Sequence, residues 1–158
     1  MLKLENIIET LPGLKGGTTD TIYDLFFAEK RMIAAIVLHP SDLTEIYLKQ
    51  KPLTLFLLGN AFTSREVKMR SIKLIEERRI AFKDKTLDEI LTMHKASMEI
   101  DYGNISSVTI KKGLLSTSLE FKVENYSKKQ INFSFNGSRI AEVEKVANKI
   151  FQAKFIHD

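Results

Sequence analysis

The 158-residue chain contains no cysteine, and this absence removes several classes of site at once. Without thiols there is no disulfide, no thiolate-ligated metal and no cysteine nucleophile. Chains without cysteine fit a reducing compartment. We therefore expect the stability of the protein to come from a packed core, which a hydrophobic content of 44% can supply.

Long hydrophobic runs are also missing. The longest uninterrupted run spans residues 32–38, and residues 53–58 are interrupted by Thr54, whereas a membrane-spanning helix needs roughly 20 apolar residues. Whether residues 53–62 form a buried helix or a strand stays open. Residues 1–5 lack the charged-then-apolar order of a signal peptide and its small-residue cleavage site. These absences predict a cytoplasmic protein without a transmembrane segment.

Motifs for catalysis and for metal binding are absent as well. His39, His94 and His157 are scattered, and the sequence has neither a His-x-x-x-His pair nor a Gly-x-Ser-x-Gly motif. The carboxylates show no paired arrangement along the chain. We therefore predict a protein that is not an enzyme and has no cofactor or metal, although folding can assemble carboxylates that lie apart in a sequence.

What the chain does contain is an alternation of apolar and polar residues between positions 98 and 135. Side chains of a strand alternate between its two faces, so each alternating run predicts a strand with one buried face. Glycine and asparagine separate the runs, and both tolerate the positive φ that turns require. We expect four antiparallel strands. Their buried positions would be Met98, Ile100, Tyr102, Val108, Ile110, Leu119, Phe121, Val123, Ile131, Phe133 and Phe135.

After Gly137 the hydrophobic period becomes that of a helix. A helix over residues 138–155 is predicted, with Ser138 as its N-cap. The apolar face of this helix would consist of Ile140, Val143, Ala147 and Ile150. Because that face needs a partner, we predict that the helix caps the apolar face of the sheet.

Residues 1–38 predict a short helix, a loop and a hairpin. Apolar residues at helical spacing over positions 4–11 end at Pro12-Gly13, and we expect this helix to dock on the domain rather than anchor to a membrane. A flexible loop follows to residue 19. Residues 21–38 then form a hairpin, and its second strand is apolar almost throughout, which predicts cover on both faces.

Residues 41–96 are predicted to be a helical insertion between this hairpin and the later strands. Capping boxes begin at Thr63 and at Thr86, and they open helices over residues 64–80 and 87–95. These helices can cover the outer face of the hairpin. The predicted fold class is therefore α+β, in one domain that spans the whole chain.

The segment MEIDYGNISSVTIKKGLLSTSLEFKV, the later INFSF and the C-terminal helix together resemble the pleckstrin-homology-like (PH-like) domains of bacteria and archaea. In that family an I-x-Y-x-x-I-x-x-V element opens a run of antiparallel strands. The resemblance covers about the last 60 residues well and residues 21–38 loosely. It implies a PH-like antiparallel β-barrel or curved sheet capped by the C-terminal helix and used as a binding scaffold. The residues that match the element are Ile100, Tyr102, Ile105 and Val108.

The net charge of +4 is mild, but residues 65–85 carry eight basic and four acidic residues, an excess equal to that of the whole chain. Some lysines and arginines fall among the apolar residues of the predicted helix. Either their aliphatic portions cover apolar surface, or their charged groups form a basic rim that binds anions. Paired bases at a hairpin turn often keep sheet edges soluble. The candidate anion or partner surface consists of Arg65, Lys68, Arg78, Arg79, Lys30 and Arg31.

These observations favour a non-enzymatic binding or scaffold module that contacts a protein partner or a second copy of itself. An exposed apolar arc on residues 64–80 would support this function. The alternative is peripheral binding to anionic membrane lipid or to nucleic acid through the basic rim of the insertion. Base stacking has little support, since Phe82 is the only aromatic residue among these bases.

Overall fold

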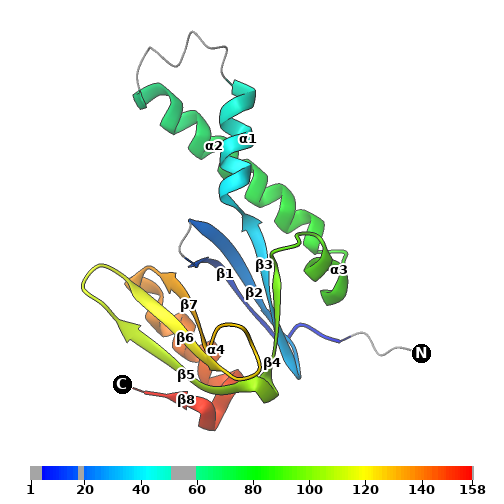
Figure 1. Cartoon of the computed structure of the whole chain (residues 1–158), viewed down its shortest axis with the longest axis vertical. Helices are drawn as coiled ribbons and strands as arrows, with labels where there is room; N and C mark the ends of the chain where they lie inside the picture. Colours follow the sequence, from blue (N-terminus) through cyan, green and yellow to red (C-terminus); the bar gives the residue numbers. More distant parts are fainter. Residues whose placement is uncertain (1–4, 18–19, 51–59, 158) are drawn as a thin grey trace.

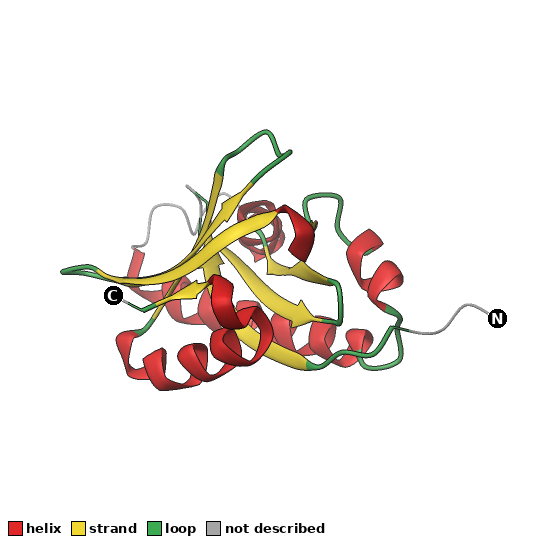
Figure 2. Cartoon of the chain, turned by 90° about the horizontal axis from the view of Figure 1, so that it is seen from below, coloured by secondary structure: helices red, strands yellow, loops and turns green. Residues whose placement is uncertain are grey.

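The computed structural model describes residues 5–17, 20–50 and 60–157, which form an α+β fold (Figures 1 and 2). The strands are β1 (Glu9–Gly16), β2 (Thr21–Phe27), β3 (Arg31–Leu38), β4 (Met98–Asp101), β5 (Ile105–Lys112), β6 (Thr117–Val123), β7 (Gln130–Phe135) and β8 (Phe155–Ile156). The helices are α1 (Pro40–Gln50), α2 (Asn60–Phe82), α3 (Leu87–Thr92) and α4 (Ile140–Phe151).

The strands form one curved sheet that does not close, in the order β4-β3-β2-β1-β7-β6-β5-β8. Every neighbouring pair is antiparallel except β5 and β8, which run parallel. The insertion α1–α3 occupies the connection between β3 and β4, as predicted. Figure 1 shows α1 and the first half of α2 extending beyond the sheet.

The inner face of the sheet carries the main core, which α4 covers. Leu119, Phe121 and Phe133 are at most 1% exposed, and Ile131 packs against them. From α4, Phe151 meets Phe121 in an edge-to-face contact with a centroid distance of 5.6 Å. The predicted sealing of this apolar face by the C-terminal helix is therefore confirmed.

A second, smaller core lies on the outer face, where α2 and α3 cover β2 and β3. Its buried members include Phe26, Ile33 and Val37 from the sheet and Phe82 and Ile90 from the helices. From Met32 to Leu38, β3 is buried without interruption because both of its faces are covered. The two-sided cover predicted for this strand is confirmed.

The helix predicted over residues 4–11 is wrong, because the structure places β1 at Glu9–Gly16. Leu11 and Leu14 are both buried in the main core, whereas a regular strand would place residues three apart on opposite faces. The register shows why: Pro12 and Gly13 together oppose the single residue Asp24, so β1 contains a β-bulge. The helix prediction rested on the spacing of residues 4–11, but Ile7 and Ile8 are 43% and 40% exposed, so these two residues form no buried helical face.

The presence of β1 also changes the structure assigned to the neighbouring N-terminal residues. Residues 15 and 16, predicted as part of a flexible loop, belong to β1, and the hairpin over residues 21–38 is the second hairpin of the sheet rather than the first. Gly16 fits there because a Cβ at this position would lie 2.7 Å from the Tyr23 ring. Residues 1–4 lie outside the described part of the chain.

Several helix boundaries also differ from the predictions. α2 begins at Asn60, so Thr63 lies inside the helix and is not an N-cap. The capping box of Thr86 and Glu89 is present, but α3 ends at Thr92 instead of residue 95. Most of residues 53–62, whose structure the sequence leaves open, lies outside the described part of the chain.

The C-terminal helix is shorter than residues 138–155. α4 starts at Ile140, with Arg139 at its N-cap position making no side-chain capping bond. Ser138 lies instead in a short 3-10 turn over Gly137–Arg139, which Asn136 caps by accepting the Ser138 N–H at 3.0 Å. After Phe151 the chain turns through Gln152, whose φ is 45°. This reversal lets β8 pair with β5, which buries Phe155.

Candidate functional site

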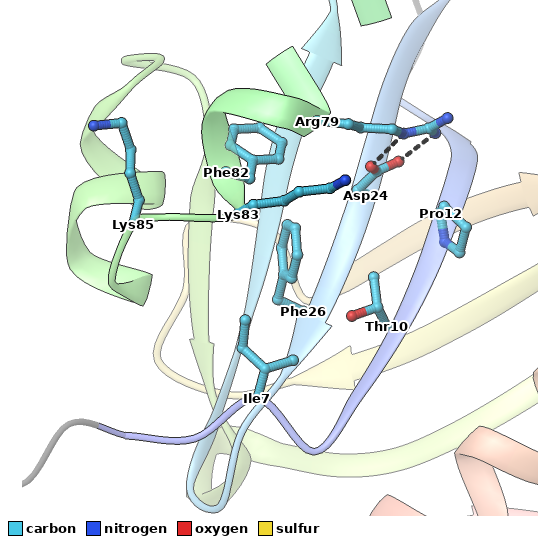
Figure 3. Close-up of a pocket in the computed structure, with 9 residues that line it drawn as sticks. All are labelled: Ile7, Thr10, Pro12, Asp24, Phe26, Arg79, Phe82, Lys83 and Lys85. Carbon is cyan, nitrogen blue, oxygen red and sulfur yellow. Dashed lines mark hydrogen bonds and ion pairs between the residues drawn. The ribbon is translucent and has the colours of Figure 1, made fainter. Parts of the chain in front are cut away.

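The strongest candidate site is a hollow of about 380 Å³ on the outer face of the sheet, which we call the outer groove (Figure 3). It lies between β1 and β2 on one side and the C-terminal end of α2 on the other. This volume falls in the range of ligand sites in proteins. The residues that line it are Ile7, Thr10, Pro12, Asp24, Phe26, Arg79, Phe82, Lys83 and Lys85.

The floor of the outer groove is aromatic and rigid. Phe26 of β2 and Phe82 at the end of α2 meet edge to face, with ring centroids 5.6 Å apart and an interplanar angle of 87°. Both are buried, as members of the outer core. Ile7, which is 43% exposed, forms an outer wall, so the groove opens to solvent beside a fixed apolar surface.

A buried carboxylate lies at one end of the groove. Asp24, which is 2% exposed, accepts the Gly13 N–H at 2.8 Å through Oδ1. The bulge in β1 makes this bond available, since Gly13 adopts φ 72° and has no strand partner opposite it. Arg79 completes the site: its Nε lies 2.7 Å from Oδ2 and its Nη2 lies 2.7 Å from Oδ1.

This bidentate pair holds the cation in one position. Hydrogen bonding to Asp24 raises the pKa of Arg79, against the opposing effect of partial burial, so the guanidinium stays charged. Nε and Nη2 are engaged, while Nη1 makes no hydrogen bond within the described residues. The side chain of Arg79 is 39% exposed, so two N–H donors remain available to an anion entering the groove.

Two lysines add positive charge at the rim. Lys83 and Lys85 follow the end of α2, and both are exposed. Figure 3 shows Lys83 extended across the groove toward the Asp24–Arg79 pair, whereas Lys85 points away from it. An aromatic floor beside a fixed guanidinium and a lysine suits a group that is both apolar and anionic.

The predicted surface residues are not brought together. Arg79 belongs to the outer groove, but Arg78, one residue earlier, turns to α1 and pairs with Asp42. Arg65 and Lys68 are exposed farther toward the start of α2. The structure therefore separates the four bases of the insertion into three places instead of one rim.

The two hairpin bases lie elsewhere again. Arg31 makes ion pairs with Glu5 at 2.8 Å, with Asp88 at 2.9 Å and with Glu99 at 2.9 Å. Hydrogen bonding to Glu99 and Glu5 raises the pKa of Arg31 although burial opposes it. Lys30 is exposed beside it. Three carboxylates surround Arg31, so it serves to join the N-terminal segment, α3 and β4 and is not open to an external anion.

Sequence reasoning missed Asp24, Phe26, Lys83 and the two residues of the bulge as members of a site. One signal was present: Asp24 interrupts an apolar run in a strand that is covered on both faces, and such a carboxylate needs a partner. The identity of that partner was not visible, because Arg79 is 55 residues away.

A larger hollow of about 510 Å³ lies where the end of β1 meets the loop between β6 and β7. Tyr126 of that loop donates to the Glu99 carbonyl at 3.0 Å and accepts the Asp101 N–H at 3.3 Å, so the loop also covers the free edge of β4. This hollow has Lys128 as its only charged lining residue. The outer groove is smaller, but it combines a carboxylate, an arginine, two lysines and an aromatic floor.

No protein-family model, curated protein or solved structure matches this chain. Within the described residues, no helix combines the length and the apolar character needed to cross a bilayer. In the same part of the chain, histidine and carboxylate side chains form no group of three that is placed to hold a metal ion.

Proposed function

We propose that this protein is a non-enzymatic binding module that takes an acidic, apolar segment of a partner protein into the outer groove. The observation that carries the proposal is the fixed Arg79 guanidinium beside the Phe26–Phe82 floor. An aromatic or aliphatic side chain of the partner would lie on the floor. A carboxylate next to it would meet Arg79 and Lys83.

A PH-like architecture is part of the same proposal. Four points support it: the strand order, the antiparallel pairing of β1 to β7, the C-terminal helix on the inner apolar face and the insertion within a single strand connection. The resemblance of residues 98–135 to that family led to the same expectation. Because fold does not fix function, the binding proposal depends on the groove and not on the architecture.

Binding of anionic lipid or nucleic acid through a basic rim of the insertion has less support. Arg78 is paired with Asp42. Arg79 belongs to the outer groove, apart from Arg65 and Lys68, so the four bases form no continuous rim. Arg65 and Lys68 alone would make a weak and strongly salt-dependent contact.

Self-association has a specific observation in its favour. Met69, Ile72 and Ile80 share one face of α2 and are 62%, 47% and 62% exposed. Arg65 and Glu76 lie on the same face. An antiparallel second copy of α2 would place Met69 against Ile72 and Arg65 against Glu76 of its partner, so the arc is complementary to itself. This is our second candidate function.

The outer groove can be tested with displayed random peptides. We expect selection on the intact protein to enrich peptides that carry an acidic residue next to an aromatic or aliphatic one. The double variant K83E/K85E should weaken the best binder at least tenfold, because like charges would then face each other. Circular dichroism and thermal melting would show that the variant is folded.

The matched control is K128E/K129E, which changes the net charge by the same amount in the loop between β6 and β7. It should leave peptide binding unchanged. Equal losses in both variants would mean non-specific charge attraction and would contradict the proposal. Enrichment of peptides without acidic residues, or binding only of small anionic molecules, would contradict it as well.

A further inference from the structure

The hairpin between β5 and β6 ends in a tight turn that carries two fully exposed leucines. Leu114 and Leu115 have relative accessibilities of 106% and 101%, which are the highest among the exposed large apolar residues of the described chain. Gly113 N–H donates to the Ser116 carbonyl at 2.9 Å and closes the turn. Figures 1 and 2 show this hairpin reaching away from the body of the sheet.

Nothing in the fold requires leucine at these positions. Such turns usually carry glycine, asparagine, aspartate or serine, which suit the backbone and water. Leu114 and Leu115 belong to neither hydrophobic core. The turn is also tightly built, since a Cβ on Gly113 would lie 2.7 Å from the Ser116 carbonyl oxygen. The hairpin therefore holds two apolar side chains out in solvent.

Positive charge flanks the leucines. Lys111 and Lys112 end β5, and no acidic residue occurs between positions 102 and 119. Lys111 pairs with the buried Glu120 at 2.7 Å, yet its side chain is 56% exposed. Lys112 makes no ion pair or hydrogen bond within the described residues, although Glu144 lines the same hollow.

The two lysines lie on opposite faces of the sheet. Lys112 is on the inner side with Ile110 and Glu144, and Lys111 is on the outer face. Lys111 pairs across the strands with Ser118, Ser118 with Ser134, and Ser134 with Lys15. Residues that pair in this way share one face, so Lys15 lies in the same row as Lys111. Its ammonium is 3.9 Å from the exposed Asp20. The apolar tip thus stands at the end of a row of two lysines and two serines.

We propose that this hairpin tip inserts Leu114 and Leu115 into the interface of an anionic lipid bilayer, while Lys111 and Lys112 contact the lipid headgroups. A stable protein interface needs roughly 800 Å² from each partner, and a narrow convex turn with two leucines offers much less. A bilayer accepts a small convex apolar tip, and its anionic headgroups attract the flanking lysines.

A single tryptophan at the tip reports insertion directly. The chain contains no tryptophan, so the L115W variant has one indole at the proposed contact. We expect its emission to shift to the blue with vesicles of phosphatidylcholine and phosphatidylglycerol at about three to one. Brominated acyl chains should quench it. The control is M93W, with its indole at an exposed position at the end of α3, and its emission should not change with either kind of vesicle.

Flotation measures the contribution of the leucines. The double variant L114S/L115S should partition into the same mixed vesicles at least tenfold less than the wild-type protein, and added salt should weaken the binding of both. The control L48S/M93S removes two exposed apolar residues from α1 and from the end of α3, away from the groove and the α2 arc, and should float like the wild type. All four substituted residues are exposed, so both variants should keep the fold.

Three results would overturn the proposal. The first is an L115W emission that mixed vesicles leave unchanged. The second is equal flotation of the wild-type protein and L114S/L115S. The third is a wild-type protein that does not bind vesicles but forms a dimer, while L114S/L115S forms none. That result would show that the tip contacts protein and not lipid. None of these results bears on the outer groove, which is tested by other residues.

Discussion

Asp42 and Arg78 form a bidentate ion pair in which Nη1 lies 2.7 Å from Oδ2 and Nη2 lies 2.8 Å from Oδ1. Nη1 also donates to the Val37 carbonyl at 3.0 Å, so one guanidinium joins α2 to both α1 and β3. Burial raises the pKa of Asp42, but hydrogen bonds from Arg78 and the His39 N–H outweigh it and lower the pKa overall. Consecutive arginines of α2 thus hold different parts of the fold.

Replacing Arg78 should destabilise the protein. In R78M the carboxylate of Asp42, whose side chain is 12% exposed, loses its partner. We expect the free energy of unfolding to fall by about 2 kcal/mol, measured by urea denaturation. A double-mutant cycle with D42N should give a coupling energy above about 1 kcal/mol. Additive single effects would contradict the pairing.

Glu66 provides the control on the same helix. Its ion pair with Arg70 at 3.5 Å is solvent-exposed on both sides. E66Q should therefore change the free energy of unfolding by no more than about 0.5 kcal/mol.

Gly16 tests the corrected position of β1. In G16A the new methyl group would lie 2.7 Å from the Tyr23 ring and 3.1 Å from Phe133, which the packed core cannot accommodate without a shift. We expect a loss of about 1–3 kcal/mol in the free energy of unfolding. G103A is the matched control, because a Cβ there meets nothing within 4 Å, and it should be close to neutral. Equal effects at the two glycines would argue against the strand.

His94 should make stability depend on pH. Burial first, and then the charge of His39, lower the pKa of His94 despite the opposing charge of Asp42; Arg78 and Lys95 add to the lowering. The unfolded chain, with an imidazole pKa near ~6.5, then binds the proton more readily than the folded one. Stability should be complete above that pH and should decrease as the pH falls below it.

Thermal melting between pH 7.5 and pH 5.5, roughly one unit on either side of the imidazole pKa, would measure this effect. The H94Q variant should lose that part of the pH dependence. Asp42 contributes to the pH dependence of stability at lower pH. Its pKa is lowered in the folded state, so its stabilising effect is lost only when the pH falls far enough to protonate the carboxylate. An identical pH profile for H94Q and the wild type would exclude His94 as the cause.

The exposed arc on α2 predicts a specific pattern of self-association. The wild-type protein should show a concentration-dependent dimer in sedimentation equilibrium, and I72E should weaken it at least tenfold because a charge would enter the apolar contact. R65E and E76R should each weaken the dimer as well. Combined in one chain they should restore it, since the antiparallel arrangement pairs these two positions.

A monomer at all concentrations would remove this candidate function. A dimer that I72E leaves intact would place the contact on another surface. Failure of R65E/E76R to restore what each single variant loses would exclude the antiparallel arrangement.

Much of the fold could be predicted from local patterns. The buried face of a strand follows from a two-residue alternation, as at Leu119 and Phe121. The buried face of a helix follows from the helical period, as at Val143 and Ala147. Neither pattern depends on distant residues. The same holds for the capping box of Thr86, whose partner is three residues away. Local signals of this kind depend on neighbours in the sequence, so the sequence contains them in full.

The prediction failed where a local pattern had two explanations. The spacing of Ile7, Ile8 and Leu11 suits one face of a helix, yet Ile7 and Ile8 are exposed and Leu11 is buried in a strand. Only the pairing of β1 with β2 shows this. The same pairing determines the site. Gly13 meets Asp24 because the bulge leaves its N–H free to donate to that carboxylate, and Arg79 reaches Asp24 because the end of α2 packs on the outer face beside Phe26.

The sequence by itself determined the buried faces of the later strands and of the C-terminal helix, because the spacing of apolar residues sets them. Only the tertiary structure decided which charges meet. Arg78 and Arg79 are neighbours with the same chemistry, yet one joins two helices and the other forms the cationic end of a groove. Their partners are carboxylates from separate elements, and long-range packing alone brings these within hydrogen-bonding distance.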